Sequence, residues 1–148
     1  MNLYNPKEKN GVHKVEIYIV DAVAFLAYLA DKLPKKADDI FRKAEKKEIK
    51  LLIPSIVLGE TLYTIYKGKQ IFGKEIPLEK IDLIFQILKN GEIFKLVDLN
   101  LDAWYIFHGL NIPELHDRMI AATFFYYKAR GLITNDPEIS ESLHKIWK

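Results

Sequence analysis

The sequence predicts an α/β fold, a three-layer α/β/α sandwich around a central, mainly parallel sheet of about four strands. Short apolar runs alternate with segments of helical pattern, and strands separated by helices are typical of a parallel sheet. The apolar runs also lack a strict polar and apolar alternation, which indicates strands that are buried on both faces. In open sheets of this kind, ligands bind beyond the carboxyl ends of the strands.

The expected elements follow one another along the chain. Four apolar runs read as strands, at residues 15–20, 51–55, 92–99 and 131–134. Seven segments have the spacing or the end signals of helices, at residues 22–30, 33–50, 55–67, 77–91, 101–110, 116–131 and 137–147. The segment 77–91 carries proline inside its start and glycine past its end, which is typical of a helix. Residues 68–77 contain two glycines and are expected to form a loop.

Composition favours one globular domain. The chain has 148 residues, of which 49% are hydrophobic and 28% are charged, as is typical of a protein that buries a core. We assign residues 15–148 to a single domain and the polar residues 1–14 to a tail without the apolar core of a signal peptide. The most apolar segment, 15–30, contains Glu16 and Asp21 and is short for a membrane span. We therefore expect a cytoplasmic protein without membrane association.

Charge and cysteine content exclude several classes of function. With 22 basic and 20 acidic residues the formal net charge is only +2, so any binding of nucleic acid must depend on a local site. The absence of cysteine excludes disulfides, thiolate zinc sites and thiol catalysis, and it fits a reducing compartment. Abundant Lys, Glu and Ile with few Gln make the composition thermophile-like.

Four acidic residues occupy notable positions. Asp21 directly follows the first strand, and Asp136 lies one residue beyond the fourth. Asp117 starts the helix before the fourth strand, and Glu60 lies in the helix after the second. Carboxyl ends of parallel strands share one edge of the sheet, so all four side chains can reach that edge. Each also has a structural explanation, because the three aspartates would serve as helix N-caps and Glu60, beside an apolar face, would pair with a lysine.

Convergence of the four acids would favour a bound cation. Two carboxylates about 5 Å apart at an effective dielectric of about 20 repel by roughly 3 kcal/mol, and four carboxylates form several such pairs. The chain has no cysteine, and His116 is the only histidine adjacent to any of these acids. An all-oxygen site suits Mg²⁺ or Mn²⁺ better than zinc, and such ions activate water for attack on a phosphodiester.

Four segments together resemble the PIN-domain ribonucleases, which include the toxin half of VapBC toxin-antitoxin pairs. They are the strand that ends at Asp21, PSIVLGETLY with its acid Glu60, HDRMIAAT with Asp117, and LITND with Asp136. The resemblance spans roughly residues 15–146. It implies a PIN-like sandwich in which the four acids form the catalytic, metal-binding site.

The resemblance also implies a function and partners. Thr134 would be the hydroxyl that supports the acids, and a divalent ion would stabilise the charge that develops on the phosphate while water cleaves RNA. The chain would be a metal-dependent ribonuclease, with an antitoxin protein as a possible partner if it is a toxin, and with a homodimer as the expected assembly.

One departure from the family pattern leaves the function open. Family members often carry Ser or Thr directly after the first aspartate, whereas Ala22 and Val23 follow Asp21 here. Loss of a supporting hydroxyl can lower metal affinity or activity tenfold or more, unless Ser55 at the neighbouring strand end supplies one. The alternative function is a non-catalytic RNA-binding or interaction module that retains the fold.

Three basic residues are candidates for contact with RNA. Arg118 adjoins Asp117 and would hold a phosphate, or it would form an ordinary salt bridge. Lys67 and Lys69 flank the glycine-containing loop beside several aromatic residues, a mixture that can grip single-stranded RNA. The same lysines would equally serve as a solvated helix end.

Overall fold

The structure is a computed structural model that describes residues 15–148, so the predicted tail at 1–14 lies outside the described residues. Its main sheet has five strands in the order β5-β2-β1-β6-β7. Every neighbouring pair in this sheet is parallel. The strands are β1 (Glu16–Val20), β2 (Ile49–Pro54), β5 (Phe94–Val97), β6 (Gly131–Ile133) and β7 (Lys145–Ile146). The predicted α/β fold is thus confirmed, with five strands rather than about four.

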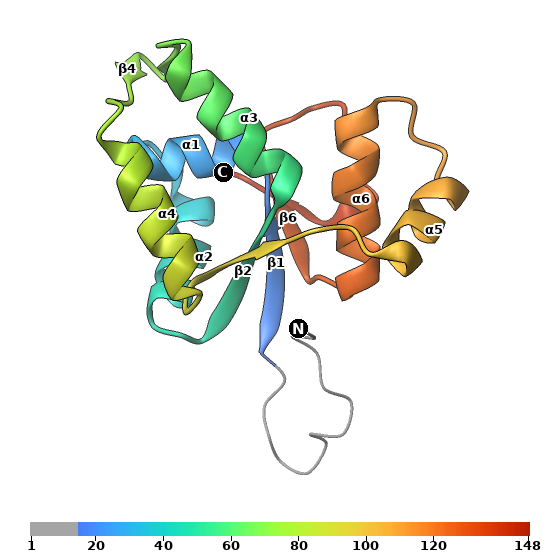
Figure 1. The fold of residues 1–148 in the computed structure, drawn as a ribbon. Helices are drawn as coiled ribbons and strands as arrows, with labels where there is room; N and C mark the ends of the chain where they lie inside the picture. Colours follow the sequence, from blue (N-terminus) through green and yellow to red (C-terminus); the bar gives the residue numbers. More distant parts are fainter. Residues whose placement is uncertain (1–14) are drawn as a thin grey trace.

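Helices cover both faces of the sheet. α5 and α6 pack together on one side, while α1, α2 and α4 lie on the other (Figure 1). The helices are α1 (Ala22–Leu29), α2 (Lys35–Glu45), α3 (Ser55–Tyr66), α4 (Lys80–Asn90), α5 (Leu101–Gly109) and α6 (Leu115–Tyr127). None of the helices in residues 15–148 is long and apolar enough to cross a membrane.

The two central strands are buried because both faces are covered. All of β1 after Glu16 and nearly all of β2 are buried, as the continuous apolar runs predict. On one face, Phe25 of α1 and Phe41 of α2 meet Phe94 of β5, with ring centroids 5.6 and 5.9 Å from it. These contacts fix the start of α1, and with it the end of β1, against the rest of the core.

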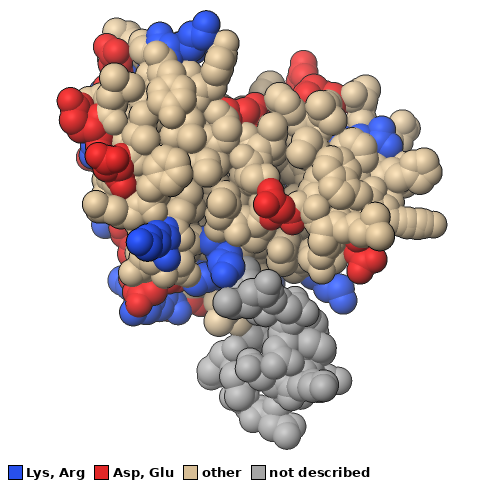
Figure 2. All heavy atoms as spheres, viewed as in Figure 1, with Lys and Arg blue, Asp and Glu red and all other residues tan. Residues whose placement is uncertain are grey.

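Charged side chains of both signs are interspersed on the face shown in Figure 2, separated by broad areas of other residues. This distribution agrees with the formal net charge of +2. Binding of a polyanion would therefore depend on a local arrangement of lysines or arginines.

The expected loop at 68–77 is wrong in part, because a small hairpin occupies most of it. β3 (Gln70–Ile71) pairs antiparallel with β4 (Lys74–Glu75). The turn between them places Phe72 at φ 49° and Gly73 at φ 79°. Two successive positive φ values are typical of the tight turns that match the twist of paired strands, and glycine at one position was the visible signal.

The predicted last helix at 137–147 is also wrong. This segment contains one 3₁₀ turn (Glu141–Leu143) followed by β7. The amide of Leu132 donates to the carbonyl of His144 at 3.3 Å, and the amide of Thr134 donates to the carbonyl of Ile146 at 3.1 Å. Pairing with the open edge of β6 therefore outweighs the local helix signals.

Candidate active site

Asp21 occupies the carboxyl end of β1 and is also the N-cap of α1. Its Oδ1 accepts a hydrogen bond from the amide of Ala24 at 2.9 Å, so the capping explanation for this residue is correct. Its Oδ2 accepts a second hydrogen bond from the hydroxyl of Thr134. Only 6% of Asp21 is exposed. A capping aspartate needs no such burial, so its environment exceeds what a cap alone requires.

Burial gives Asp21 an unusual affinity for protons. Its pKa is raised from 3.8 to about 6, chiefly by removal from water. The hydrogen bonds from Thr134 and Ala24 oppose this rise, and the carboxylates of Asp136 and Glu60 contribute to it. A buried carboxylate with acidic neighbours is stabilised in its charged form by a cation.

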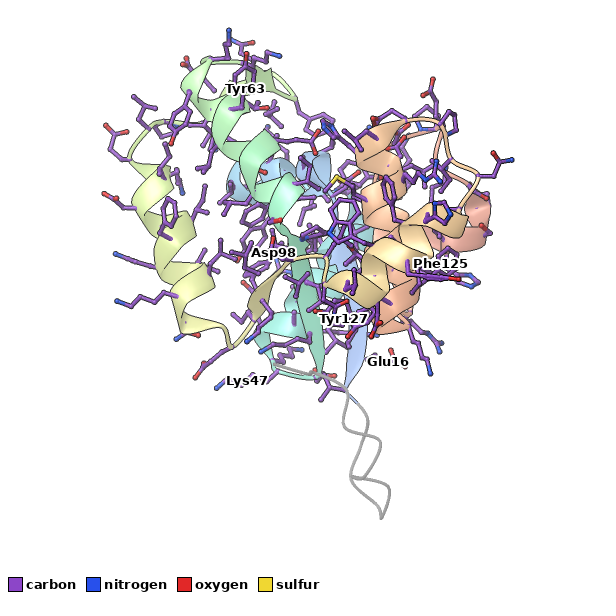
Figure 3. All side chains as sticks on the ribbon, turned by 45° about the vertical axis from the view of Figure 1, so that its right-hand side comes forward. Glu16, Lys47, Tyr63, Asp98, Phe125 and Tyr127 are labelled. Atoms are coloured by element: carbon purple, nitrogen blue, oxygen red, sulfur yellow. The ribbon has the colours of Figure 1, made fainter. Side chains whose placement is uncertain are left out.

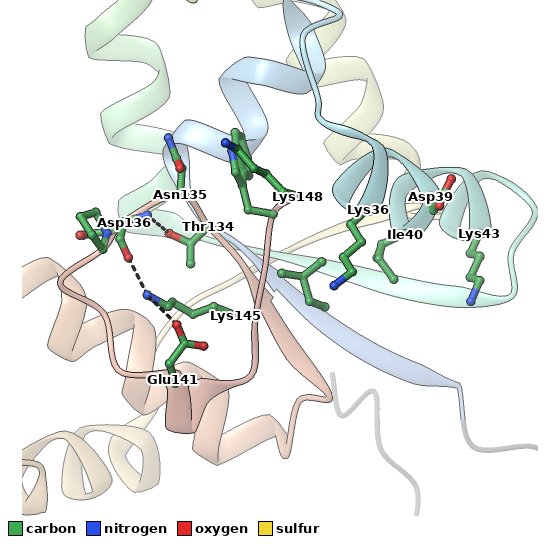
Figure 4. A pocket seen from close by; sticks show the side chains of 13 residues that line it. Lys36, Asp39, Ile40, Lys43, Thr134, Asn135, Asp136, Glu141, Lys145 and Lys148 are labelled. Carbon is green, nitrogen blue, oxygen red and sulfur yellow. Dashed lines mark hydrogen bonds and ion pairs between the residues drawn. The ribbon is translucent and has the colours of Figure 1, made fainter.

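Thr134 connects the ends of β1 and β6. Its buried hydroxyl donates to Asp21 and accepts a hydrogen bond from the amide of Asp136 at 3.0 Å. The Oδ1 of Asp136 in turn accepts from the amide of Glu138 at 2.9 Å. Asp136 therefore orders a turn and caps no α-helix. Its partly exposed side chain lines a groove beside the site (Figure 4).

Asp117 lies in the first turn of α6 but is not the N-cap of that helix. Glu114 is the cap, and its carboxylate accepts from the amides of His116 at 2.8 Å and Asp117 at 3.0 Å. The carboxylate of Asp117 is thus available for another role. Its pKa is raised to about 6, chiefly by partial burial and also by Asp136, Glu114 and other nearby acids.

Glu60 faces α6 from the opposite side of the site. Its Oε2 lies 3.2 Å from Nδ1 of His116, and both side chains are partly exposed. Glu60 thus contacts a histidine rather than the expected lysine, and the contact is an ion pair only when the imidazole is protonated. Burial raises the pKa of Glu60, while His116 lowers it. This contact joins α3 to the start of α6 across the sheet edge.

The four predicted acids share one edge of the sheet, but their carboxylates do not converge closely enough to coordinate one metal ion. Asp21 and Asp117 each have pKa values raised by Asp136 and Glu60, which places the four carboxylates in one electrostatic environment. Within residues 15–148, however, no three acidic or histidine side chains are close enough to hold a metal ion. Electrostatic interaction extends over several ångströms, whereas Mg²⁺ requires oxygen atoms at about 2.0–2.1 Å.

The donor chemistry nevertheless fits a hard divalent cation. All four side chains offer carboxylate oxygens, and their mutual repulsion is the property that a cation relieves. Glu60 is directed to His116 and Asp136 to the amide of Glu138, so rotation of these side chains would be needed to complete a coordination shell.

The supporting hydroxyl for Asp21 comes from Thr134. Ala22, half-buried at the start of α1, has no hydroxyl to offer. Ser55 is the first residue of α3 and is half-buried at the end of β2. The hydrogen bonds that affect the carboxylate of Asp21 come from Thr134 and Ala24 rather than from Ser55.

The structure places Arg118 away from the acids. Its guanidinium donates to the carbonyls of Phe107 at 2.8 Å and His108 at 3.0 Å, and it lies 4.8 Å from the centre of the Phe107 ring. These carbonyls belong to the end of α5, where unpaired carbonyl groups accept hydrogen bonds. Arg118 thus fastens α5 to α6, and we leave it out of the proposed contacts with RNA.

Lys67 and Lys69 follow the end of α3, and both are exposed. The ammonium of Lys67 lies 5.2 Å from the centre of the Tyr63 ring. This contact matches the solvated helix end that the sequence left open as an alternative.

Asp98, an acid within the predicted strand 92–99, lies away from the four acids of the site. It lines a separate hollow together with Tyr126 and Tyr127 of the last turn of α6. Asp98 and Tyr127 are labelled in Figure 3. Asp117 lies in the first turn of the same helix, about 15 Å away along the axis at the usual rise per residue.

Sequence reasoning missed the cap formed by Glu114 and the contact between His116 and Glu60. Glu114 stands three residues before Asp117, a spacing that allows a side chain to cap the amides of the following turn. The pairing of His116 with Glu60 joins residues far apart in the chain, and no local pattern identifies it.

Comparison with known proteins identifies the family of the chain. The family model described as "PIN domain" matches residues 18–142. No functionally curated protein sequence is significantly similar to the chain.

Two solved structures share the fold. One is VapBC2 from Rickettsia felis bound to a DNA fragment from its promoter, with 19% identity and a TM-score of 0.59 over 81% of this chain and 88% of that chain. The other is Mycobacterium tuberculosis VapC20, a toxin that cleaves the sarcin-ricin loop, with 13% identity and a TM-score of 0.54 over 84% and 94%. At these identities the likeness establishes the fold alone. From the family match, the chain belongs to the PIN-domain family, whose members are typically metal-dependent nucleases.

Proposed function

We propose that this chain is a divalent-metal-dependent ribonuclease that hydrolyses RNA phosphodiester bonds with water. The observation that carries the proposal is the environment of Asp21. Its carboxylate is buried at a strand end, is oriented by Ala24 and Thr134, and has two further acids near enough to raise its pKa. In its charged form, such a buried carboxylate does not stabilise the folded chain. It is suited instead to the binding of a cation.

Asp21, Glu60, Asp117 and Asp136 would hold Mg²⁺ or Mn²⁺. When bound, such an ion lowers the pKa of water and stabilises negative charge on a phosphate. The hydroxyl of Thr134 keeps Asp21 oriented and also fixes the backbone of Asp136. The contact with His116 holds Glu60 at the rim of the site.

The decisive experiment is cleavage of a mixed pool of single-stranded and hairpin RNAs by the purified chain. It is run with Mn²⁺, with Mg²⁺ and with a chelator. We expect metal-dependent cutting that falls by at least about a hundredfold in Asp117→Asn, because loss of a ligand should exceed the roughly 10- to 100-fold cost of losing a group that supports one.

Asp102→Asn is the matched control. Asp102 is also an acid in the first turn of a helix, but that helix is α5 and the residue is exposed. Its substitution should leave cutting unchanged. Equal losses in both variants would contradict the assignment of Asp117.

We further propose that the chain is the toxin of a toxin-antitoxin pair, that its antitoxin is a separate protein, and that it forms a homodimer. The fold shared with VapBC2 and VapC20 supports the first two parts. The large apolar side chains that are exposed on α5 and α6, including Leu101, Tyr105 and Phe125, support an interface between copies. Light scattering after size-exclusion chromatography tests the dimer, and a monomeric mass would exclude it.

A non-catalytic RNA-binding module is the second candidate, and two observations favour it. Ala22 provides no hydroxyl beside Asp21, and within residues 15–148 the acids do not close around a point. This function would be established by RNA binding without any cutting, together with a melting temperature that neither Mg²⁺ nor Mn²⁺ shifts.

A further inference from the structure

Next to the acidic edge lies a groove whose free charges are mainly positive. It has a volume of about 660 Å³, and its walls come from α2, from the loop after β6 and from the last residues of the chain (Figure 4). Thr134 and Asp136 lie on one side of it, and Lys36 and Lys43 of α2 lie on the other. The groove is therefore continuous with the site that we assign to catalysis.

Most of the acidic side chains that line this groove already form ion pairs with lysines. Asp39 pairs with Lys35 at 3.4 Å, and Glu141 pairs with Lys145 at 3.4 Å. The ammonium of Lys145 also donates to the backbone carbonyl of Asp136 at 3.1 Å. These contacts cancel most of the negative charge that the groove would otherwise present.

The positive charge of three lysines that line the groove is not neutralised by an acidic partner. In the part of the chain that the structure describes, Lys36, Lys43 and Lys148 take part in no ion pair. Lys36 and Lys43 are exposed and lie two helical turns apart on α2, about 10 Å along the axis. Unpaired ammonium groups at this spacing suit a ligand with repeated negative charges.

An aromatic ring completes the groove. Trp147 lines it, and Phe72 at the tip of the β3–β4 hairpin stacks on Trp147 with ring centroids 6.0 Å apart and planes inclined by 30°. The backbone carbonyl of Trp147 accepts from the amide of Ala37 at 3.2 Å. Phe72 adopts φ 49°, which is unfavourable for a bulky side chain and is retained only where the surroundings enforce it.

We propose that this groove, built on Lys36, Lys43 and Trp147, binds the single-stranded RNA that flanks the bond to be cut. The lysines contact successive phosphates, and a base packs against the indole of Trp147. Lysines combined with an aromatic ring are the means by which proteins hold single strands without reading their sequence. The inference rests on the proposed ribonuclease function, since it takes the adjacent acids as the place of cleavage.

The test is a binding measurement in which no cleavage can occur. Fluorescence anisotropy of a labelled ten-nucleotide single-stranded RNA is recorded against the full chain in EDTA, at several salt concentrations. The double variant Lys36→Gln with Lys43→Gln is expected to bind on the order of tenfold more weakly at 0.1 M salt, with a salt slope lower by about 1.4, because two phosphate contacts are lost.

The same helix provides a matched control. Arg42 and Lys46, at the end of α2, carry the same total charge as Lys36 and Lys43 but lie outside the groove, and Asp38, the partner of Arg42, also lies outside it. The double variant Arg42→Gln with Lys46→Gln should retain at least half of the affinity. Equal weakening in both double variants would overturn the proposal, since it would reflect net charge alone.

Two further outcomes separate the groove from the catalytic proposal. Binding that depends on Lys36 and Lys43, in a chain that cuts no RNA with any metal, would support the groove and reject the ribonuclease. No binding of RNA, with lysine-dependent binding of a polyglutamate peptide instead, would overturn the groove proposal and assign the groove to an acidic protein partner.

The proposed packing of a base against Trp147 is tested separately, by tryptophan fluorescence. The chain has 2 tryptophans, so a Trp104→Phe variant leaves Trp147 as the only source of indole fluorescence. Addition of the ten-nucleotide RNA in EDTA should quench this fluorescence at the same concentrations at which anisotropy rises. Anisotropy that rises without quenching would overturn the contact between a base and Trp147.

Discussion

Asp21 and Asp136 both follow a strand of the sheet, but the chain continues differently after each. After Asp21 it enters α1, and the carboxylate becomes the cap of that helix. After Asp136 it makes a side-chain-stabilised turn, a single 3₁₀ turn and then β7. Asp21 is buried and Asp136 is partly exposed. The same local signal therefore gives two structures, and after Asp136 the pairing of β7 with the open edge of β6 replaces a helix.

The largest expected difference between these two aspartates is in stability at neutral pH. The pKa of Asp21 is raised from 3.8 to about 6 in the folded chain, which corresponds to about 3 kcal/mol of destabilisation once the carboxyl is ionised. Because the folded pKa lies above the unfolded one, stability should fall as pH rises from about 4 through about 6. Asp21→Asn removes this loss, since Asn also caps helices and can donate to Thr134.

Urea unfolding in EDTA at pH 4 and pH 7 measures this effect. Relative to the parent chain, Asp21→Asn should gain about 3 kcal/mol between the two pH values. Asp136→Asn should stay within about 0.5 kcal/mol, because Asn makes the same turn at a partly exposed position. Parallel pH dependences for the parent and Asp21→Asn would show that burial of Asp21 does not affect folding.

A smaller effect is expected at the residue that joins the two strand ends. Thr134→Val deletes the hydroxyl that donates to Asp21 and accepts from Asp136. It should cost about 2 kcal/mol, because a buried carboxylate oxygen and an amide lose their partner. Thermal and urea unfolding at pH 7 measure the loss.

Thr123→Val is the matched control for this substitution. Thr123 is 3% exposed and Thr134 is 2% exposed. The hydroxyl of Thr123 donates to the carbonyl of Met119 within α6, which a helix normally pairs with an amide. Its loss should cost under about 1 kcal/mol. A cost for Thr123→Val equal to that for Thr134→Val would argue against a special role for the hydroxyl between the aspartates.

The smallest effect concerns the pairing of β6 with β7. A Cβ at Gly131 would lie 2.9 Å from the carbonyl oxygen of His144 and 3.0 Å from Cδ1 of Ile146. Gly131→Ala must therefore displace β7, at a cost of about 1 kcal/mol or more. Gly59→Ala on α3 has nothing within 4 Å of the added Cβ and should stabilise by about 0.5–1 kcal/mol.

Hydrogen exchange of the backbone amides distinguishes these two glycine variants. Gly131→Ala should accelerate exchange at Leu132 and Thr134, whose amides donate to the segment from His144 to Ile146. Gly59→Ala should leave exchange there unchanged. Unaltered protection in Gly131→Ala would mean that β7 accommodates the methyl group without leaving the sheet.

Most of the fold followed from local patterns in the sequence. The helix from 77 was expected because of its proline and glycine, and α4 ends at Asn90 before Gly91 at φ 68°. Buried strands were expected from continuous apolar runs, as in β1 and β2. The failures fell where tertiary contacts compete with weak local preferences, in the hairpin after α3 and in the segment that became β7.

The candidate site was likewise predicted only in part from local patterns. Positions at strand ends selected Asp21 and Asp136 from the sequence, because parallel strands bring their carboxyl ends to one edge. Spacing allowed Glu114 to cap α6 but did not choose it over Asp117, and no pattern showed that Arg118 is bound to the end of α5. Side-chain pairing depends on which groups folding brings within reach, and such groups can be distant in the chain.

The sequence by itself determined most of the order of strands and helices up to β6, the absence of any thiol chemistry and the identity of four acids able to share one edge. Only the tertiary structure decided how buried each acid is, and therefore that the pKa of Asp21 is raised to about 6. It alone placed Lys36 and Lys43 opposite Asp136 across one groove. The physical reason is that residue type fixes charge and donor chemistry, whereas desolvation and proximity exist only after distant segments have packed together.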